Sequence, residues 1–590
     1  MNVTVFTTLR NAGARLARFC LPAAVLLAAN VVITPAAHAQ TWTNGGGNGL
    51  WSNLSNWTAT PGVYRYFDNT GVGASTANAY SNNFWGLFVT NSTGTHAINI
   101  NSGTLAFGTY SQIEIGNSAT GAMQLSNGTF LAPQLNSQPL RLGRANTAAA
   151  AGTLIGTSSL TTTLGFTGLS TVGYADSTFN AAANLNMADS DNGSLTFASL
   201  RAAFTQSTGI ATSNMSFGDN WTFNIGSSGA RGEMVFGSAS STGTANSSFT
   251  TGTGGSFTAY TSSLYVGTGA NTTSKTSIVD MSGINNGLID HSGGNSSFSV
   301  GRGAGSGSLK LGSDWTMNVN TDHAVFIGYD GGTGSITGTN MTLSGSIPYL
   351  YVGTLDSGAV GGNGTLDMGG GSMGSGLVVS AYLRIGNGGN STGTVKFGSG
   401  LVAVNGTTDI GDGGTTGVEG LLELRGTQFT GGAAAIVNVQ NSGRLNILVS
   451  DTSSGLILTR ANSAALTIAD TLSNGNGILA TFQNNPTGFN FLGTAESHDS
   501  IYWAIKWSGD QQSSLNSFIS ANKIGANTSG LTGDLAGATP EVIYDAGSNS
   551  TYYGIYVSAV PEPGTLALAS CGMALAGWSV ARRRRAAQAA

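Results

Sequence analysis

The residue types that most often carry chemistry in proteins are sparse and scattered in this chain. Beyond residue 40 there is one histidine in each of four distant segments, without the H-E-x-x-H spacing of a helical zinc site: His96, His291, His323 and His498. We expect each to be a surface side chain. The stretch Gly303-Ala304-Gly305-Ser306-Gly307 comes near the G-x-S-x-G pattern of serine hydrolases, but it has no strand-to-helix elbow around the serine.

Carboxylates are the other group with catalytic potential, because Asp and Glu pairs cleave glycosidic bonds and oxygen ligands bind Ca²⁺. Asp189-Ser190-Asp191-Asn192-Gly193 begins like a calcium loop, but Leu200 stands where the bidentate glutamate belongs. Other acids share one repeat or flank one loop: Asp409, Asp412, Glu419 and Glu423, and Asp322 with Asp330. Three carboxylates, or two with an arginine, on one face would favour an enzyme. We predict no catalytic residues, metal or cofactor.

Composition narrows the possible partners. Residues 41–560 hold 15 basic and 26 acidic side chains, a net charge near −11. This leaves no basic patch for nucleic acid and repels acidic polymers on average. The two cysteines, Cys20 and Cys571, lie at the two ends, so disulfides do not stabilise the body between them. Glycine contributes 90 of the 590 residues and mean hydropathy is +0.07, values that favour an all-β body over disorder.

A repeated pattern organises residues 106–430. A short strand ends in glycine, a polar loop follows, and a small residue opens a second strand, as in FSVGRGAGSGSLKLG and VFIGYDGGTGSITG. The ten marker glycines are Gly116, Gly143, Gly173, Gly226, Gly267, Gly301, Gly328, Gly353, Gly386 and Gly411. Their spacings run from 25 to 41 residues, apart from one gap of 53 that has room for a degenerate copy.

Within each copy, apolar and polar residues alternate, so one face of each strand is apolar and must be buried against stacked neighbours. The glycine permits a positive φ at the corner of a coil. The sequence therefore predicts an all-β fold: a right-handed parallel β-helix or solenoid of about ten repeats. An array of β-sandwiches is the alternative, but the variable spacing fits a solenoid better.

Different patterns flank the repeats. Residues 40–105 form a Trp/Gly-rich region in which Trp42, Trp51 and Trp57 surround a glycine-rich loop. We expect these indoles to cap the solenoid; a sugar-binding platform is the alternative. Residues 431–558 carry longer apolar strands and one short helix over 513–524, which predicts a small C-terminal β domain.

Both ends of the chain resemble targeting segments. Residues 1–39 have a basic start, an apolar run and an A-x-A end, which predicts a secretory signal peptide cleaved between Ala39 and Gln40. At the other end, residues 559–585 combine Pro561-Glu562-Pro563, an apolar stretch and a final cluster of arginines: Arg582, Arg583, Arg584 and Arg585. The apolar stretch over 565–580 predicts a short transmembrane helix, with the arginines held in the cytoplasm.

These two regions carry a resemblance to known families. The tail is similar to the PEP-CTERM sorting signal, and the Trp/Gly-rich start resembles an element of autotransporter-like and PEP-CTERM β-solenoid proteins, with Asn44 in place of its first glycine. The resemblance implies a Gram-negative bacterium that makes exopolysaccharide. It also implies an exosortase that recognises Pro561, Glu562 and Pro563 and removes the tail after transient anchoring in the inner membrane.

From these features we expect an exported, non-catalytic protein of the cell surface or extracellular matrix, associated with exopolysaccharide or other components of a biofilm. Its rows of Asn, Ser and Thr would offer many weak hydrogen bonds that add up through multivalency. Two alternatives stay open: a polysaccharide lyase or hydrolase on the same solenoid, and an adhesin, which differs from the first only in its partner.

Overall fold

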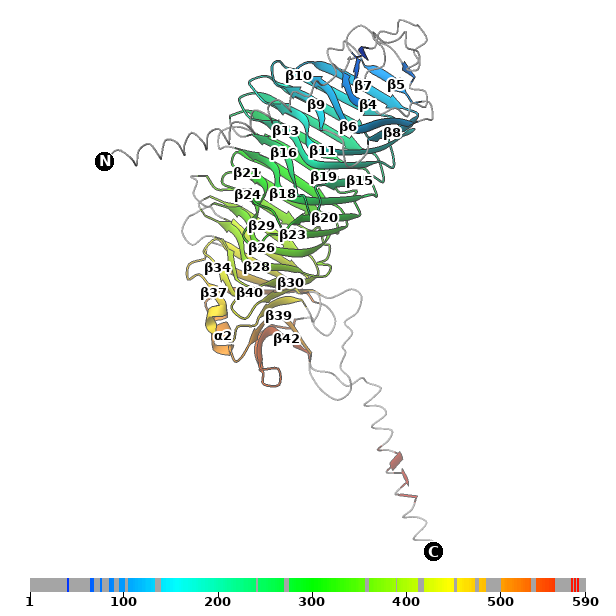
Figure 1. Ribbon diagram of the computed structural model, residues 1–590. Coiled ribbons are helices and arrows are strands. Elements are labelled where there is room, and N and C mark those ends of the chain that lie inside the picture. The colour runs from blue at the N-terminus through cyan, green and yellow to red at the C-terminus, as the bar shows by residue number, and fades with distance from the viewer. Residues whose placement is uncertain are drawn as a thin grey trace, which may run out of the picture.

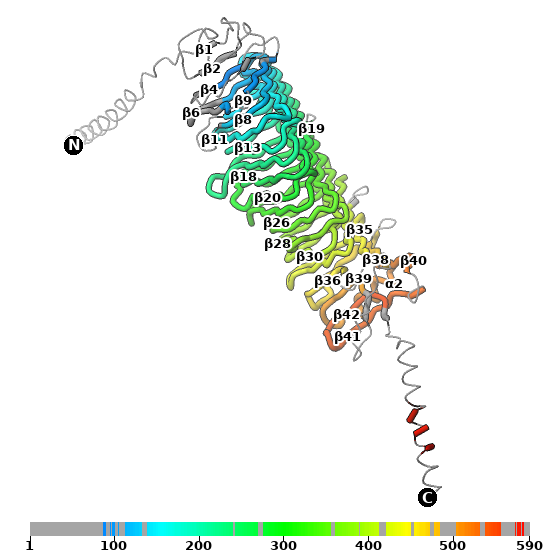
Figure 2. Tube along the Cα trace, turned by 90° about the vertical axis from the view of Figure 1, so that its right-hand side faces the viewer, coloured from blue at the N-terminus to red at the C-terminus, as the bar shows by residue number. Residues whose placement is uncertain are grey.

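The structure is a computed structural model. It describes residues 40–41, 64–67, 75–76, 84–89, 95–100, 104–132, 139–239, 242–269, 275–355, 360–388, 390–411, 419–449, 454–472, 477–483, 500–531, 537–557 and seven positions between 573 and 582. Strands stack one above another along a single long axis, from the blue N-terminal end to the orange C-terminal end (Figures 1 and 2). The predicted Trp cap at Trp42, Trp51 and Trp57 lies outside the described residues.

Two sheets run the length of the stack. The large sheet has 26 strands: β1 (Gln40–Thr41), β2 (Tyr64–Phe67), β4 (Phe84–Val89), β6 (Thr104–Asn117), β8 (Gly128–Ala132), β9 (Leu140–Ala145), β11 (Leu160–Ala175), β13 (Ser194–Thr205), β15 (Thr222–Ile225), β16 (Gly232–Ala239), β18 (Ser256–Gly269), β20 (Asn286–His291), β21 (Phe298–Arg302), β23 (Asp314–Val319), β24 (Ala324–Tyr329), β26 (Thr342–Thr354), β28 (Leu377–Asn387), β30 (Gly400–Val404), β31 (Thr407–Ile410), β33 (Thr427–Gly431), β34 (Ile436–Val439), β36 (Gly455–Leu458), β37 (Leu466–Ile468), β39 (Ser500–Ser508), β41 (Glu541–Asp545) and β42 (Ser550–Val557).

The small sheet has 16 strands, one from each turn: β3 (Ser75–Thr76), β5 (His96–Asn99), β7 (Thr120–Ser126), β10 (Ala150–Gly156), β12 (Ala181–Met187), β14 (Ile210–Phe217), β17 (Thr244–Thr250), β19 (Lys275–Met281), β22 (Gly305–Leu311), β25 (Thr333–Gly338), β27 (Asn363–Asp367), β29 (Thr392–Phe397), β32 (Glu419–Arg425), β35 (Gly443–Val449), β38 (Gly477–Gln483) and β40 (Ile524–Gly530). Two helices have described bounds, η2 (Ser463–Ala465) and α2 (Gln512–Ser520), and the seven described positions between 573 and 582 are also helical.

One turn of the chain visits both sheets. After β25 in the small sheet, the chain enters β26, whose first half pairs with β23 and whose second half pairs with β24. It then crosses at Gly353 to β27, which pairs in parallel with β25. Because successive turns pair in parallel and in sequence order, the predicted β-solenoid is confirmed, and the sandwich alternative is wrong.

Apolar side chains fill the inside of the stack as ladders. In the small sheet, one ladder contributes one residue from each strand between β7 and β35, and each residue is at most 3% exposed: Met123, Leu154, Leu185, Met215, Phe249, Val279, Leu309, Ile336, Leu366, Val395, Leu422 and Leu445. These residues are the inward-facing half of the alternating pattern in the sequence. Stacking of the turns buries the apolar surface that a single turn would expose to solvent.

All ten marker glycines have a positive φ, as predicted, and nine of them form one column of corners along the stack. At Gly328 and Gly353, a Cβ atom would lie 1.7 Å from a carbonyl oxygen of the small sheet, on Asn363 and Thr392 respectively. A side chain is therefore excluded by close backbone approach as well as by the left-handed conformation.

The register corrects one marker. Gly226 follows β15, which pairs with the first halves of β13 and β18, so it lies outside the column of corner residues. Gly237, in β16, takes that place, because its neighbours pair with those of Gly267. Ala203, with φ +47°, fills the long gap as the degenerate copy. With both included, the corner residues recur every 25 to 34 residues.

At the C-terminal end, parallel stacking of turns gives way to antiparallel strands that cover the last turn. The sequence pattern placed the end of the repeats at residue 430, whereas parallel pairing continues to β38 and β40. Among the described strands, antiparallel pairing occurs only at β42, which lies between β39 and β41. The expected short helix over 513–524 is confirmed as α2, and its Leu515 is fully buried.

Candidate functional site

His291 and His323 are the two histidines whose side chains the structure describes, and of these only His291 is fully buried, so its predicted surface location is wrong. It is fully buried at the end of β20. Its Nε2–H donates to the carbonyl of Ser296, so Nδ1 accepts a hydrogen bond from Thr261 Oγ1, 2.8 Å away. Burial lowers the pKa of His291, and nearby His323 and Arg231 lower it further. Both ring nitrogens are occupied, which indicates a structural role.

Ser306 and the acidic residues singled out in the sequence do not assemble into a reaction centre. Ser306 lies within β22, in the small sheet, and not at a strand-to-helix elbow. Asp409 belongs to the large sheet and Glu423 to the small sheet; Asp412 and the side chain of Glu419 lie outside the described residues. In the described part of the chain, no three His, Cys, Asp or Glu side chains are grouped to hold a metal ion.

The remaining acidic pairs have local roles. Asp322 and Asp330 flank opposite ends of β24. Asp191, from the loop that begins like a calcium site, accepts a hydrogen bond from the backbone N–H of Asp219 at 3.1 Å. It therefore joins two successive turns of the solenoid, and this contact accounts for an acid at that position.

One cluster does combine two carboxylates with an arginine. On the outer face of the small sheet, Arg425 contacts Asp367 at 3.7 Å and also pairs with Glu423, while Lys396 lies 3.1 Å from Asp367. Partial burial by itself raises the pKa of Asp367. Hydrogen bonds from Gly369 N–H and Lys396 outweigh burial and hold the pKa below its usual range. A general acid for glycoside cleavage needs a raised pKa, so this cluster fits an ion-pair network better.

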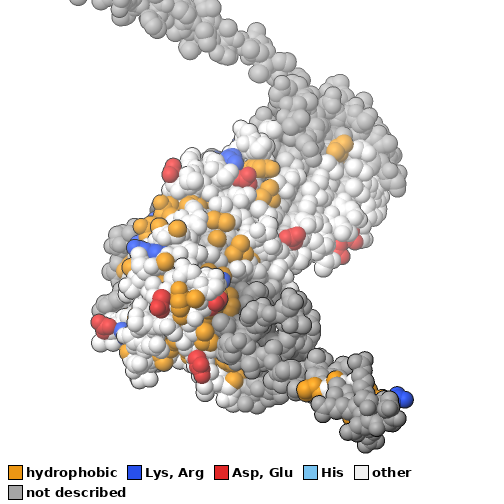
Figure 3. Space-filling model, turned by 90° about the horizontal axis from the view of Figure 1, so that it is seen from below, with side chains coloured by type: hydrophobic (Ala, Val, Ile, Leu, Met, Phe, Trp, Pro, Cys, Tyr) orange, Lys and Arg blue, Asp and Glu red, His pale blue; other side chains and the backbone are white. Residues whose placement is uncertain are grey.

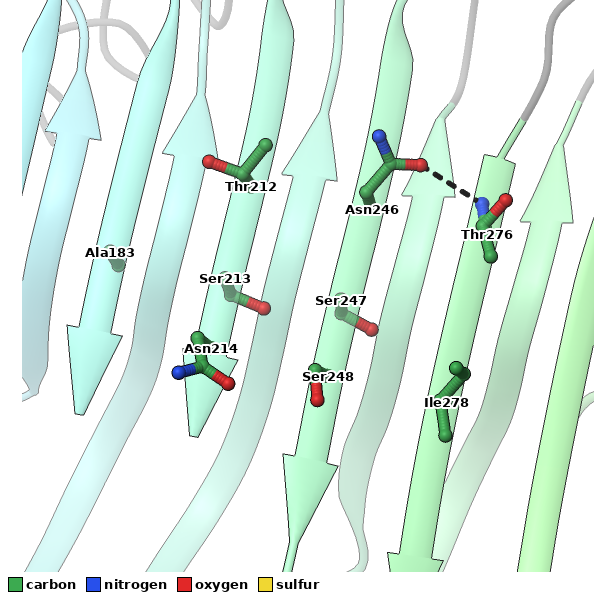
Figure 4. A pocket seen from close by; sticks show the side chains of 9 residues that line it. All are labelled: Ala183, Thr212, Ser213, Asn214, Asn246, Ser247, Ser248, Thr276 and Ile278. Atoms are coloured by element: carbon green, nitrogen blue, oxygen red, sulfur yellow. Dashed lines mark hydrogen bonds between the residues drawn. The ribbon is translucent and has the colours of Figure 1, made fainter. Parts of the chain in front are cut away.

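A shallow trough lies on the outer face of the small sheet. One part, of about 440 Å³, is lined by Ala183, Thr212, Ser213, Asn214, Asn246, Ser247, Ser248, Thr276 and Ile278 (Figure 4). A second part, of about 230 Å³, is lined by Thr120, Ala149, Ala150, Ala151, Asn180, Ala181, Ala182, Ile210 and Thr212. Because Thr212 lines both parts, they form one trough across six strands, from β7 to β19.

The trough combines hydrogen-bonding groups with small apolar patches and has no charged lining residue among those described. Asn246 Oδ1 accepts from the backbone N–H of Thr276 at 3.1 Å, and Asn214 Nδ2 donates to Asn184 Oδ1 at 3.2 Å. These bonds orient the amides and leave each amide with further donors or acceptors. Charged side chains are also few and scattered on the face seen in Figure 3.

Small residues create the trough. Where most strands carry Thr, Ser or Asn on the outer face, β10 and β12 carry Ala151 and Ala182, and the missing side-chain volume leaves a depression. Alternation in the sequence predicts the polar rows but not this depression. In the sequence, two alanine runs, TAAAAG and NAAAN, are the only sign of the depression. They indicate a depression only once the strand register is known to place them side by side.

The predicted targeting residues lie mostly outside the described part of the chain. This holds for Ala39, for Pro561, Glu562 and Pro563, and for Arg583, Arg584 and Arg585. Gln40 begins β1, and Arg582 is helical, with its guanidinium 5.2 Å from the ring centre of Trp578. Within the residues that the structure describes, no helix is both long and apolar enough to cross a membrane.

Comparisons with protein-family models, with curated proteins and with solved structures find no match for this chain. The class that the fold defines is thus a parallel β-solenoid built from sequence repeats, and the candidate site is the neutral trough on its small sheet.

Proposed function

We propose that this protein is an exported, non-catalytic component of the cell surface or extracellular matrix, and that it associates with polysaccharide through the trough. The observation that carries this proposal is a continuous, uncharged hollow lined by amides, hydroxyls and alanine methyl groups. Sugar rings present the same two kinds of surface, hydroxyl groups at the edge and C–H groups on the faces, so the trough is complementary to them.

The geometry favours a chain over a single sugar. Neighbouring strands lie about 4.8 Å apart, so the six strands of the trough span roughly 24 Å along the solenoid axis. A polysaccharide laid along the axis would meet a similar set of groups at every strand. Each contact is weak, but contacts made by one polymer add together.

Sorting of the protein is a further part of this proposal and rests on sequence motifs alone. The signal peptide directs export, and the tail over 559–585 anchors the protein transiently in the inner membrane of a Gram-negative bacterium. An exosortase then recognises Pro561-Glu562-Pro563 and removes the tail, leaving the protein at the surface or in the medium. We also propose that the solenoid is right-handed, the hand favoured for parallel crossover connections.

A polysaccharide-cleaving enzyme is the second candidate, and the Asp367–Arg425–Glu423 cluster is the observation that favours it. We prefer the binding function because ion pairs hold both carboxylates in that cluster, and because no carboxyl group in the described residues has a raised pKa among those with a resolved shift. An adhesin would use the same trough with a different partner.

The proposal is tested by removing the polar groups of the trough. We expect the triple variant Asn214→Ala, Asn246→Ala and Ser248→Ala to lose most binding to the exopolysaccharide of the host, measured by co-sedimentation. Binding by the wild type should change little between low and high salt, because no charged group lines the trough. No new reducing ends should form during the incubation.

A matched control is the double variant Thr365→Ala and Thr394→Ala, on the same face of the same sheet but outside the trough. This control variant should bind as the wild type does, and its melting temperature should equal that of the wild type. Unchanged binding by the triple variant would refute the assignment to the trough, and new reducing ends would favour the enzyme.

A further inference from the structure

A second hollow lies on a different face, the outside of the large sheet. Register places Phe326 (β24), Tyr351 (β26) and Arg384 (β28) in one row across three turns. Beyond the corner glycines, Tyr329, Thr354 and Asn387 form the next row. Together with Leu355, these six residues line a hollow of about 110 Å³.

Aromatic rings form the wall of this hollow. The ring centres of Phe326 and Tyr329 are 4.0 Å apart, and Tyr351 stacks on Phe326 at 5.3 Å. Arg384 places its guanidinium 5.5 Å from the ring centre of Tyr351 and 5.2 Å from that of Tyr382. Tyr382, which is 38% exposed, stacks on Tyr349 at 5.9 Å, so exposed aromatic surface also lies beside the hollow.

Two polar groups at this place lack hydrogen bonds. Thr354 is only 3% exposed and lines the hollow, yet its Oγ1 has no hydrogen-bond partner. The Nε of Arg384 is also buried without a hydrogen bond; the nearest acid, Asp409, lies 3.6 Å away. Other buried hydroxyl groups in the described residues also lack a partner, but Thr354 and Arg384 both line one hollow, where an external hydrogen-bonding group can reach them.

We propose that this hollow binds one neutral pyranose unit of a polysaccharide, with the sugar face on the aromatic surface and a hydroxyl group reaching Thr354 and Arg384. The hollow is smaller than a pocket for a whole drug-sized ligand, so it receives one edge of the ring. Asp409 balances the charge of Arg384, the one cation among the described residues that lines the hollow, which favours a neutral sugar over a uronate. Arg302 lies over the rings of Phe326 and Tyr329 but outside the lining. The inference rests on the proposed association with polysaccharide but uses a separate site.

The test is calorimetric titration of the purified protein with hexasaccharides of glucose, galactose and mannose, and with trigalacturonate as the acidic probe. We expect at least one neutral hexasaccharide to bind at millimolar concentration. Thr354→Val should weaken that binding about two- to tenfold, the range for one hydrogen bond. Because the hydroxyl has no partner in the free protein, the variant should melt at or above the wild-type temperature.

Thr171→Val is the matched control, since Thr171 has another buried hydroxyl without a partner on the large sheet, outside the hollow. It should bind as the wild type does. The proposal is overturned if no neutral hexasaccharide binds, if Thr354→Val binds like wild type, or if trigalacturonate binds more tightly. The triple variant of the trough at Asn214, Asn246 and Ser248 should still bind the neutral hexasaccharide. A wrong assignment of the trough can therefore be distinguished from a wrong assignment of the aromatic hollow.

Discussion

At the scale of single residues, the corner glycines determine whether successive turns can stack. We expect Gly353→Ala to destabilise the protein by roughly 2 kcal/mol or more, because φ is +59° and the new Cβ would lie 1.7 Å from Thr392 O. Thermal unfolding followed by circular dichroism measures the change. The matched control is Gly229→Ala, where a Cβ would have no neighbour within 4 Å, and equal losses in both variants would refute this account.

A second residue-scale prediction concerns acid stability. Burial lowers the pKa of His291 from 6.5, so below that pH the unfolded chain takes up a proton that the folded protein resists. Stability contributed by neutral His291 is therefore present above about pH 7 and is lost progressively as the pH falls below 6.5. We expect the melting temperature of His291→Gln to fall less over this window than that of the wild type. Parallel curves for the two proteins would show that His291 does not titrate in this way.

The sequence shows which residues can form a corner better than it shows which corner residues lie next to one another in successive turns. Ten glycines could be recognised because each follows a short run of alternating apolar residues in the sequence, and all ten have a positive φ. Gly226 and Gly237 share that local pattern, and only the pairing of β16 with β18 shows which one turns the corner. Ala203 escaped notice because alanine rarely adopts φ +47°.

At the scale of elements, the C-terminal strands close an edge that would otherwise be free to pair with another chain. β42 covers β39, whose Trp507 is fully buried and donates from Nε1 to Arg460 O at 3.0 Å. We expect a chain truncated after residue 537 to form large oligomers, measured by size-exclusion chromatography with light scattering. A monomeric truncated protein with the wild-type melting temperature would contradict a capping role for β41 and β42.

The trough shows why a site of this kind is hard to predict from sequence. Its Thr and Asn rows follow from alternation along each strand, and that part could be predicted. Its depth depends on Ala151 and Ala182 lying side by side, although 31 residues separate them, and this register is set by loop lengths throughout the preceding turns. Similarly, the aromatic hollow collects residues from three turns whose local sequences have no shared motif.

At the scale of the whole molecule, shape and charge point to the same function. A long stack of turns offers one repeated surface along its axis, and the body between residues 41 and 560 has a net charge near −11. Such a body is repelled by acidic polymers on average, and the binding of neutral chains proposed above would add up many weak contacts along it. The fold could be predicted because its repeats are local, whereas the fate of the two ends depends on motifs that lie outside the described residues.

The most direct test of an exported and sorted protein is the intact mass of the chain recovered from the culture medium and from the membranes of its own host. We predict a mass that lacks residues 1–39 and the segment that follows Pro561-Glu562-Pro563. A membrane-bound chain that still carries Arg582 to Arg585 would contradict this account, because it would show a permanent anchor in place of removal by an exosortase.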